Sequence, residues 1–175
     1  MVIDNQLKQK NLHLREKLDK IKIVLTDNDG VLTDTGVYFS SKGEEFKRFS
    51  IRDGMGIERL RKYAGVETII ITGEESGSVR ARAEKLKIKE YYLGVKKKEE
   101  LLFEIMKKHN LTVSEIAFVG DDSNDVGIMK LVGFKATPSD GMSFIKELAD
   151  YVCENKGGNG AFREVAELII AFKNK

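Results

Sequence analysis

Short apolar runs alternate with amphipathic segments along most of this chain. The runs are rich in Val, Ile and Tyr, a composition typical of strands buried in a parallel sheet. They lie at residues 21–26, 67–72, 90–93, 116–120, 133–136 and 151–153. Between them, apolar positions recur about every 3.6 residues, which predicts helices. The expected helices span residues 55–63, 76–86, 98–109, 124–131, 141–148 and 161–172.

This alternation predicts an α/β fold of Rossmann-like type. A mostly parallel central sheet would be covered by helices on both faces, which gives a three-layer sandwich. With 175 residues, one proline and no low-complexity linker, the chain 1–175 is expected to form a single domain. Residues 1–20 are interpreted as a polar lead-in, with a short helix whose apolar anchors are Leu7, Leu12, Leu14 and Leu18.

The segment 36–50 departs from the alternation. Two extended arms around a Ser-Lys-Gly turn predict a β-hairpin. Because it follows the first strand, it would project from the edge of the sheet where α/β proteins bind ligands. An isolated hairpin is marginal in water, so we expect its aromatic side chains to contact another subunit rather than their own domain. These side chains are Tyr38, Phe39, Phe46 and Phe49.

Composition narrows the class of protein. Thirty basic and 28 acidic residues leave a net charge of +2, which gives no electrostatic case for a nucleic-acid partner. No apolar run approaches the roughly 20 residues that span a bilayer. The lysine-rich N-terminus lacks the apolar core of a signal peptide. The lone Cys153 is expected to be a small buried strand residue. These features predict a cytoplasmic protein without a membrane partner.

Two aspartates follow the first predicted strand at once, in Asp27-Asn28-Asp29-Gly30. On a continuing strand, the side chains of Asp27 and Asp29 would point to opposite faces. If the chain turns after Asp27, both carboxylates can face one pocket at the carboxyl end of the sheet, where open α/β sheets bind ligands. The same pattern also occurs in solvated turns and calcium loops, so the pair alone does not define a site.

Three later features stand at the ends of further predicted strands. Thr72 and Gly73 can offer a hydroxyl and backbone N–H groups to an anion. Lys98 opens the helix after the third run and could place an ammonium near the same anion. An acidic cluster then follows the fourth run, formed by Asp121, Asp122 and Asp125. Each feature has an ordinary alternative in helix capping or surface solvation. Their joint order favours one phosphate-binding, acidic site.

The combined signature resembles the haloacid dehalogenase superfamily of phosphatases. The match follows its four motifs in order: D-x-D-G-V-L-T-D, hydrophobic-T-G, a lone lysine, and G-D-D-x-x-D. More narrowly, the chain resembles the capless phosphatases of 3-deoxy-2-ulosonic acid phosphates, the KDO 8-phosphate phosphatase family. This likeness covers roughly residues 20–170 and rests on segments 43–49, 51–56, 72–74, 120–122 and 157–165. It implies a fold without a cap domain and a place in lipopolysaccharide biosynthesis.

The resemblance also implies a Mg²⁺-dependent phosphomonoesterase that works through an aspartyl-phosphate. Asp27 would be the nucleophile and a metal ligand, and Asp121 a second carboxylate ligand. Asp29 would be the general acid and base and give its backbone carbonyl to the metal. Asp122 or Asp125 would act behind these ligands or through water. The phosphoryl oxygens would be held by the Asn28 backbone N–H, Thr72, Gly73 and Lys98.

Residue 74 leaves two substrates open. Glu74 stands where the octulosonate enzymes typically have arginine, and a glutamate would repel a substrate carboxylate. The alternative substrate is therefore a nine-carbon ulosonate 9-phosphate, of KDN or N-acylneuraminate. Glu74 could also merely cap the following helix. Candidate substrate contacts are Arg52, Glu74, Lys85, Gly157 and Gly158. Arg52 and Arg163 could equally form plain ion pairs.

A site without a cap is shallow. The resemblance implies a homotetramer in which neighbouring subunits close the site with the hairpin and the glycine-rich segment 155–160, which we expect to be mobile. A receiver domain of two-component signalling is the main alternative from another class. It would place its acceptor aspartate after the third strand, but residues 90–93 contain no aspartate. The order of the motifs therefore favours the phosphatase.

Overall fold

Each of the six apolar runs forms a strand of one parallel sheet. In the computed structural model, which describes residues 5–173, the strand order is β5-β4-β1-β6-β7-β8. The bounds are β1 Ile23–Thr26, β4 Glu67–Ile71, β5 Glu90–Tyr92, β6 Ile116–Val119, β7 Phe134–Thr137 and β8 Tyr151–Val152. The first strand is central, between β4 and β6, and all the pairs are parallel. The predicted sheet is confirmed.

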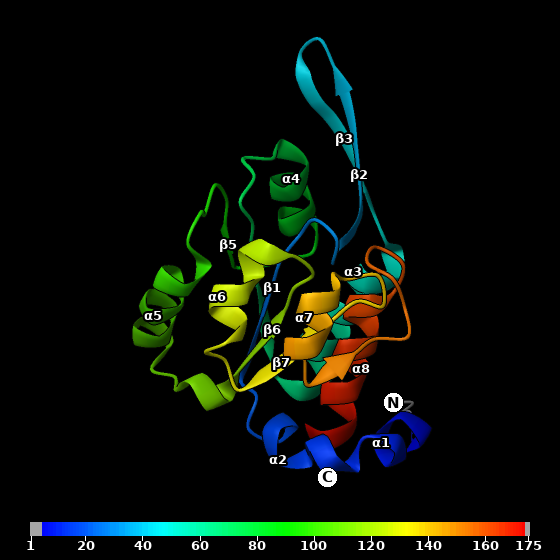
Figure 1. Ribbon diagram of the computed structural model, residues 1–175, viewed down its shortest axis with the longest axis vertical. Coiled ribbons are helices and arrows are strands. Elements are labelled where there is room, and N and C mark those ends of the chain that lie inside the picture. Colours follow the sequence, from blue (N-terminus) through cyan, green and yellow to red (C-terminus); the bar gives the residue numbers. More distant parts are fainter. Residues whose placement is uncertain (1–4, 174–175) are drawn as a thin grey trace.

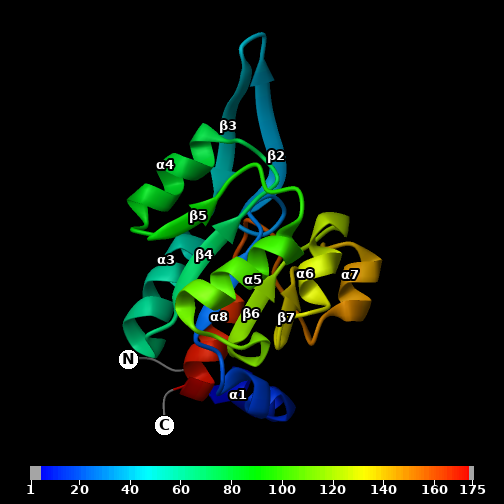
Figure 2. The same cartoon turned by 90° about the vertical axis from the view of Figure 1, so that its left-hand side faces the viewer.

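Helices cover both faces of this sheet (Figures 1 and 2). Alternate residues of a strand point to opposite faces, so Val24 packs in one core cluster and Leu25 in the other. The first cluster includes residues of α2, α3, α4 and α8, and the second includes residues of α5, α6 and α7. The bounds are α2 Arg15–Leu18, α3 Ile51–Arg59, α4 Gly77–Lys85, α5 Lys98–His109, α6 Val126–Met129, α7 Ser143–Leu148 and α8 Ala161–Lys173.

Two of the helices that differ from their predicted bounds do so for clear local reasons. The helix expected at 55–63 begins at Ile51, because the Ser50 side chain accepts a hydrogen bond from the Asp53 N–H and caps it. It continues as a π-helical turn, Leu60–Ala64, and ends at Gly65 with φ +66°. The helix expected at 124–131 is shortened, because Asp122 caps a 3₁₀ turn that precedes α6.

The hairpin is present and stands apart from the sheet. Its strands, β2 Thr33–Ser40 and β3 Gly43–Phe49, form an antiparallel pair that projects from the top of the molecule in Figure 1. Tyr38, Phe39 and Phe46 are 66%, 73% and 68% exposed. Phe49 was wrongly grouped with them: it is half-buried and packs against the main core.

The described part of the lead-in is helical and lies against α8. It contains α1, Asn5–Lys10, and α2, and both helices contact α8. Leu14 and Leu18 are buried, and Leu7 packs against the core. Leu12 is 47% exposed, so its predicted role as an anchor was wrong. Cys153 is buried as predicted. Within residues 5–173, no helix has the length and apolar character to cross a membrane.

Candidate active site

Three neighbouring strands deliver the predicted site residues to one edge of the sheet. Asp27 follows β1, Thr72 follows β4 and Asp121 stands two residues after β6. Because these strands are parallel and adjacent, their carboxyl ends meet at the same place. A pocket of about 230 Å³ opens there. It is lined by Asp27, Asp29, Thr35, Thr72, Gly73, Glu74, Asp121, Asp122 and Asn124.

The chain turns directly after Asp27, as the convergence of the two aspartates requires. The backbone N–H groups of Val31, Leu32 and Thr33 all donate to the Asn28 carbonyl, at 3.3, 2.9 and 3.1 Å. Gly30 takes φ +86°, a conformation that glycine adopts without strain. This tight turn brings Asp27 and Asp29 to the same pocket.

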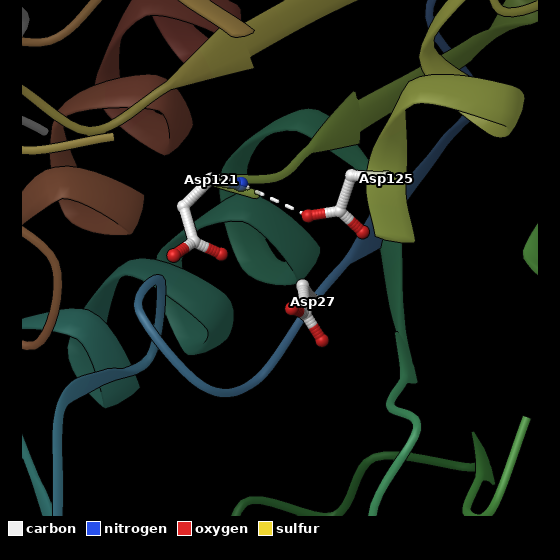
Figure 3. Close-up of side chains that lie close together, drawn as sticks. All are labelled: Asp27, Asp121 and Asp125. Atoms are coloured by element: carbon white, nitrogen blue, oxygen red, sulfur yellow. Dashed lines mark hydrogen bonds between the residues drawn. The ribbon is translucent and has the colours of Figure 1, made fainter. Parts of the chain in front are cut away.

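Lys98 is fully buried beneath the acidic cluster. Its Nζ lies 2.8 Å from Asp27 Oδ1 and 2.7 Å from Asp125 Oδ1. The second oxygen of Asp125 accepts the Asp121 backbone N–H at 2.9 Å, as Figure 3 shows. Asp125 therefore uses both oxygens to hold Lys98 and the Asp121 backbone in place. Asp27 also accepts the Asn28 N–H on Oδ1 at 2.7 Å, so its two contacts share one oxygen.

The balance of charge in this cluster is unfavourable without a further cation. Burial, and then Asp125, raise the pKa of Asp27 to about 7 despite Lys98. Burial, and then Asp27 and Asp125, raise the pKa of Asp121 to about 8. Burial alone would lower the pKa of Lys98, but the two aspartates raise it above its ordinary value. Several buried carboxylates thus share one ammonium.

The same residues fit a divalent metal ion. Asp27, Asp121 and Asp125 each offer an oxygen, and these oxygens lie within 4.8 Å of one another. Asp121 Oδ1 is buried and has no hydrogen-bond partner among the described residues, an arrangement that is costly unless a ligand satisfies the oxygen. Carboxylate oxygens are the ligands that Mg²⁺ prefers. Both oxygens of Asp125 are engaged, by Lys98 and by the Asp121 N–H, whereas the contacts of Asp27 share one oxygen. Asp27 and Asp121 are therefore the carboxylates that each have an oxygen left to bind the ion.

We expect added Mg²⁺ to raise the melting temperature more at about pH 8 than at about pH 5. The folded-state pKa values of Asp27 and Asp121, about 7 and 8, lie above the ordinary 3.8. Protons on these groups therefore stabilise the fold at low pH, and this contribution is lost as the pH rises through 7 and 8. Mg²⁺ competes with those protons. Thermal melts with and without Mg²⁺ at each pH test this, and an equal gain at both would contradict it.

The second strand end forms the turn that the sequence predicts to bind an anion. Thr72 is buried, and its Oγ1 accepts the Glu74 N–H at 3.2 Å. The Lys96 ammonium donates to the Gly73 carbonyl at 3.0 Å and so braces the turn from outside. Glu74 itself lines the pocket. The interpretation of Glu74 as a helix cap is wrong, because Ser76 caps α4 by accepting the Val79 N–H.

The other candidate substrate contacts lie outside this pocket. Arg52 lines a separate hollow of about 490 Å³ beside α1 and α8, which contains none of the acidic cluster. Lys85 is exposed at the far end of α4. Arg163 pairs with Glu167 through its Nε at 2.7 Å. Within this chain, Arg163 thus forms an ion pair, which was the alternative to substrate binding. Arg52 and Lys85 stay candidate substrate contacts.

The glycine-rich segment packs closely on the turn that carries Asp29. The Gly158 N–H donates to the Val31 carbonyl at 2.9 Å. A Cβ on Gly157 would lie 1.9 Å from the Gly30 carbonyl oxygen, and one on Gly158 would lie 2.4 Å from Thr33 C. These glycines are therefore needed for close approach of two backbones. The mobility expected of residues 155–160 stays a prediction.

We expect Gly157→Ala to lower the free energy of unfolding by about 1–3 kcal/mol, the usual cost of overpacking. Turnover should fall as well, because the added methyl group pushes on the turn that carries Asp29. Denaturant unfolding and phosphatase assays measure the two effects. Gly77→Ala is the matched control, since a Cβ there meets nothing within 4 Å at the start of α4. Equal stability of both variants would refute the packing argument.

Sequence reasoning missed three residues at the site. Thr35 and Asn124 line the pocket, and Lys47 binds the Asp29 carboxylate. Asn124 lies within the G-D-D-S-N-D motif, so its position was a usable signal. Thr35 takes φ +66°, rare for a non-glycine residue, which local sequence does not reveal. Lys47 reaches the site through the long-range pairing of the hairpin.

Comparisons with known proteins agree with this geometry. Residues 94–165 match the haloacid dehalogenase-like hydrolase family. The chain is 36% identical to the 3-deoxy-D-manno-octulosonate 8-phosphate phosphatase KdsC of Haemophilus influenzae, covering 93% of this chain and 89% of that protein. It is 35% identical to KdsC of Escherichia coli K12, covering 91% of this chain and 84% of that protein.

A solved structure extends the likeness to three dimensions. The phosphatase of the same name from Moraxella catarrhalis, crystallised with a magnesium ion, a phosphate ion and KDO, superposes with a TM-score of 0.89. The identity is 34%, and the match covers 94% of both chains. The fold and the site define a phosphatase of the α/β class. The chain belongs to the haloacid dehalogenase-like hydrolases, among relatives named KdsC.

Proposed function

We propose that this phosphatase is Mg²⁺-dependent and hydrolyses KDO 8-phosphate, or a closely related 3-deoxy-2-ulosonic acid phosphate, through an aspartyl-phosphate intermediate. The observation that carries the proposal is the buried contact of Asp27 with Lys98 at one corner of the acidic pocket. A carboxylate held by a cation at a strand end can attack phosphorus while the cation offsets the charge of the phosphate.

Each step of the proposed reaction is assigned to a residue that lines this pocket or that contacts Asp27 from behind it. Asp27 would attack phosphorus and carry the phosphoryl group. Thr72, the Gly73 N–H and Lys98 would hold the phosphoryl oxygens, with the Asn28 N–H beside them. Asp29 would donate a proton to the leaving sugar oxygen and then take one from the water that hydrolyses the intermediate.

Asp27, Asp121 and the backbone carbonyl of Asp29 would hold Mg²⁺. When bound, the ion supplies positive charge that offsets repulsion between the phosphate dianion and the attacking carboxylate. Asp125 would act behind these ligands by fixing Lys98 and the Asp121 backbone. Asp122 is exposed at the pocket rim, where it can contact the ion through water.

The names of the relatives support the eight-carbon substrate. The nine-carbon alternative rests on Glu74 and gains no support from the comparisons. The test is phosphate release with Mg²⁺ from a panel that contains KDO 8-phosphate and the KDN and N-acylneuraminate 9-phosphates. We expect kcat/KM to be highest for KDO 8-phosphate. Preference for a nine-carbon ester would overturn the substrate assignment. If none of the esters is hydrolysed, the proposed function is wrong.

The exposed aromatic tip of the hairpin supports an assembly of subunits. Tyr38, Phe39 and Phe46 give the projecting hairpin an exposed apolar surface. We expect a tetramer in which this surface is covered, as the family resemblance implies. Light scattering gives the mass in solution. A Phe39→Asp/Phe46→Asp variant should dissociate to smaller species, and a monomeric wild-type protein with full activity would contradict the assembly.

A further inference from the structure

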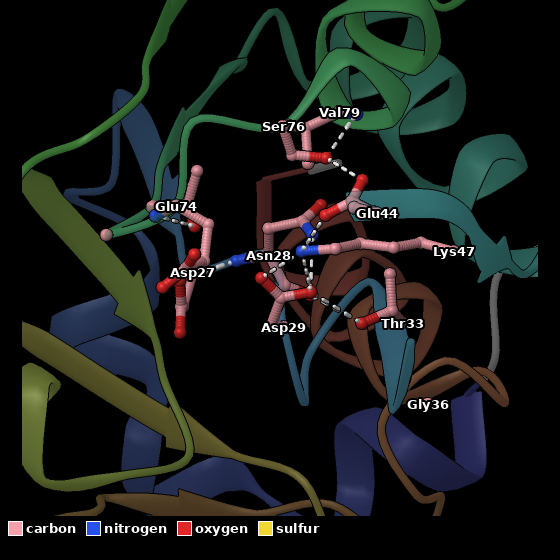
Figure 4. A network of polar contacts seen from close by, with 12 residues as sticks. Asp27, Asn28, Asp29, Thr33, Gly36, Glu44, Lys47, Glu74, Ser76 and Val79 are labelled. Atoms are coloured by element: carbon pink, nitrogen blue, oxygen red, sulfur yellow. Dashed lines mark hydrogen bonds and ion pairs between the residues drawn. The ribbon is translucent and has the colours of Figure 1, made fainter. Parts of the chain in front are cut away.

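Lys47 is a buried lysine that reaches Asp29 from the hairpin. Its side chain is 2% exposed, and its Nζ donates to both carboxylate oxygens of Asp29, at 2.9 and 2.7 Å. Figure 4 shows this side chain approaching Asp29 on the side opposite Asp27. Asn28 Nδ2 and Thr33 Oγ1 also donate to Asp29 Oδ1, at 3.0 and 3.3 Å. Four contacts from three side chains therefore fix the direction of this carboxylate.

A second carboxylate holds Lys47 from the other side. Glu44 Oε2 lies 3.4 Å from its Nζ, and Glu44 Oε1 accepts from Ser76 Oγ at 2.5 Å. Ser76 in turn accepts the Val79 N–H at the start of α4. A buried ammonium is stable where it is paired in this way. The network thus joins the turn after β1, the hairpin and the helix that follows the Thr72 turn.

A β-bulge makes this network possible. On a regular strand, Glu44 and Lys47 would point to opposite faces, because they are three residues apart. Tyr38 of β2 pairs with Phe46 of β3, and the next residue of β2, Phe39, pairs with Glu44. Glu45 is therefore an extra residue on β3. The extra residue shifts the alternation of side chains between the two faces of β3, which brings Glu44 and Lys47 to the same face. Bulges often direct side chains toward active sites in this manner.

We propose that Lys47 is a positioning residue of the phosphatase reaction, which holds the Asp29 carboxylate where it meets the leaving sugar oxygen. The Lys47 ammonium is held by both oxygens of Asp29 and by Glu44, on the side of Asp29 opposite Asp27, so it acts through Asp29 and not on the substrate. Glu44 has the supporting role of orienting Lys47. The proposal rests on the proposed function, because it assigns a purpose to the contact with Asp29 as acid and base.

The experiment compares two leaving groups. Lys47→Met keeps the length of the side chain and removes the ammonium. We expect kcat/KM for KDO 8-phosphate, an alkyl ester that needs a proton donor, to fall by about 10²-fold. The kcat/KM for p-nitrophenyl phosphate should fall by less than about 5-fold, because its leaving group departs without a proton and kcat/KM does not include the later hydrolysis of the aspartyl-phosphate. Lys47→Arg should restore most of the KDO 8-phosphate turnover.

Asp29→Asn is the reference variant. It should also lose activity on KDO 8-phosphate much more than on p-nitrophenyl phosphate. Because the two residues act as one unit, the double variant Asp29→Asn/Lys47→Met should be no slower than Asp29→Asn. Lys89→Met is the matched control. It removes an exposed lysine–carboxylate pair with Glu67 at the opposite edge of the sheet and should leave both rates unchanged.

The results for the two variants distinguish the role of Lys47 from the role of Asp29 in the proposed function. If Asp29→Asn shows the selective loss and Lys47→Met does not, the role of Lys47 is overturned while the proposed function stands. If Lys47→Met lowers both rates equally, Lys47 supports the fold and not the carboxylate, and the proposal also fails. If Asp29→Asn has no selective effect, the assignment of Asp29 in the proposed function is wrong.

Discussion

Replacing Asp27 with asparagine is expected to lower phosphatase turnover by at least about 10³-fold, as the loss of a covalent nucleophile does in other enzymes. The amide has nearly the shape of the carboxylate and can still accept the Asn28 N–H, but it is a poor nucleophile. Lys98 keeps Asp125 as its charged partner, so the chain should still fold. Initial rates on KDO 8-phosphate give the size of the loss.

A direct measurement distinguishes a covalent mechanism from direct attack by water. Wild-type protein quenched in acid during turnover should carry one phosphoryl group on the peptide that contains Asp27, and Asp27→Asn should carry none. Asp19→Asn is the control, because Asp19 is an exposed aspartate that precedes β1 at the opposite edge of the sheet. Full turnover by Asp27→Asn would exclude the aspartyl-phosphate mechanism.

Replacing Lys98 with methionine is expected to abolish measurable turnover and to lower the free energy of unfolding by about 3–5 kcal/mol, the usual cost of leaving a buried charge without its partner. Asp27 and Asp125 would then face each other without the ammonium that lies 2.8 and 2.7 Å from them. Thermal or denaturant unfolding measures the loss, and the phosphate panel measures turnover.

The stability loss should depend on pH with a definite sign. The pKa of Asp27 is already raised to about 7, so the folded chain binds a proton there more tightly than the unfolded chain does. Without Lys98 this preference grows, and the fold weakens further as the pH rises. The deficit of Lys98→Met should therefore be smaller at about pH 5 than at about pH 8.

Lys97→Met is the matched control for this variant. Lys97 is the preceding residue, but its side chain is 67% exposed and pairs with Glu100 on the surface. Its loss should leave the unfolding free energy and turnover almost unchanged. If the two variants were equally stable, the buried contact would not contribute to folding as described.

Much of the fold follows from local patterns. Buried parallel strands read as short apolar runs, so all six strands of the sheet lie close to their predicted places. The helix predicted at 98–109 has those bounds, with Glu99 in its first turn and Asn110 ending it at φ +53°. The bounds of α3 and α6 were displaced, because Ser50 and Asp122 cap these helices at points that apolar spacing does not mark.

The candidate site followed from the order of motifs along the chain. Asp27, Thr72 and Asp121 each stand after a strand, and a parallel sheet brings such positions to one edge. The different roles of the aspartates in the cluster could not be predicted from that order. That Asp125 holds both Lys98 and the Asp121 backbone depends on distances between side chains of different segments.

The sequence by itself determined the α/β architecture and the set of acids, threonine and lysine at the strand ends, because periodicity and turn chemistry act over a few residues. The tertiary structure alone decided that Lys47 lies against Asp29 and that Gly157 packs on Gly30. The first contact depends on the hairpin, which returns Lys47 to the turn after β1, while an extra residue in β3 brings Glu44 to the same lysine. The second depends on two backbones that meet across more than half of the chain. Neither the phase of a bulged strand nor a long-range approach is encoded in a local pattern, so the partner of the proposed acid and base had to be found in three dimensions.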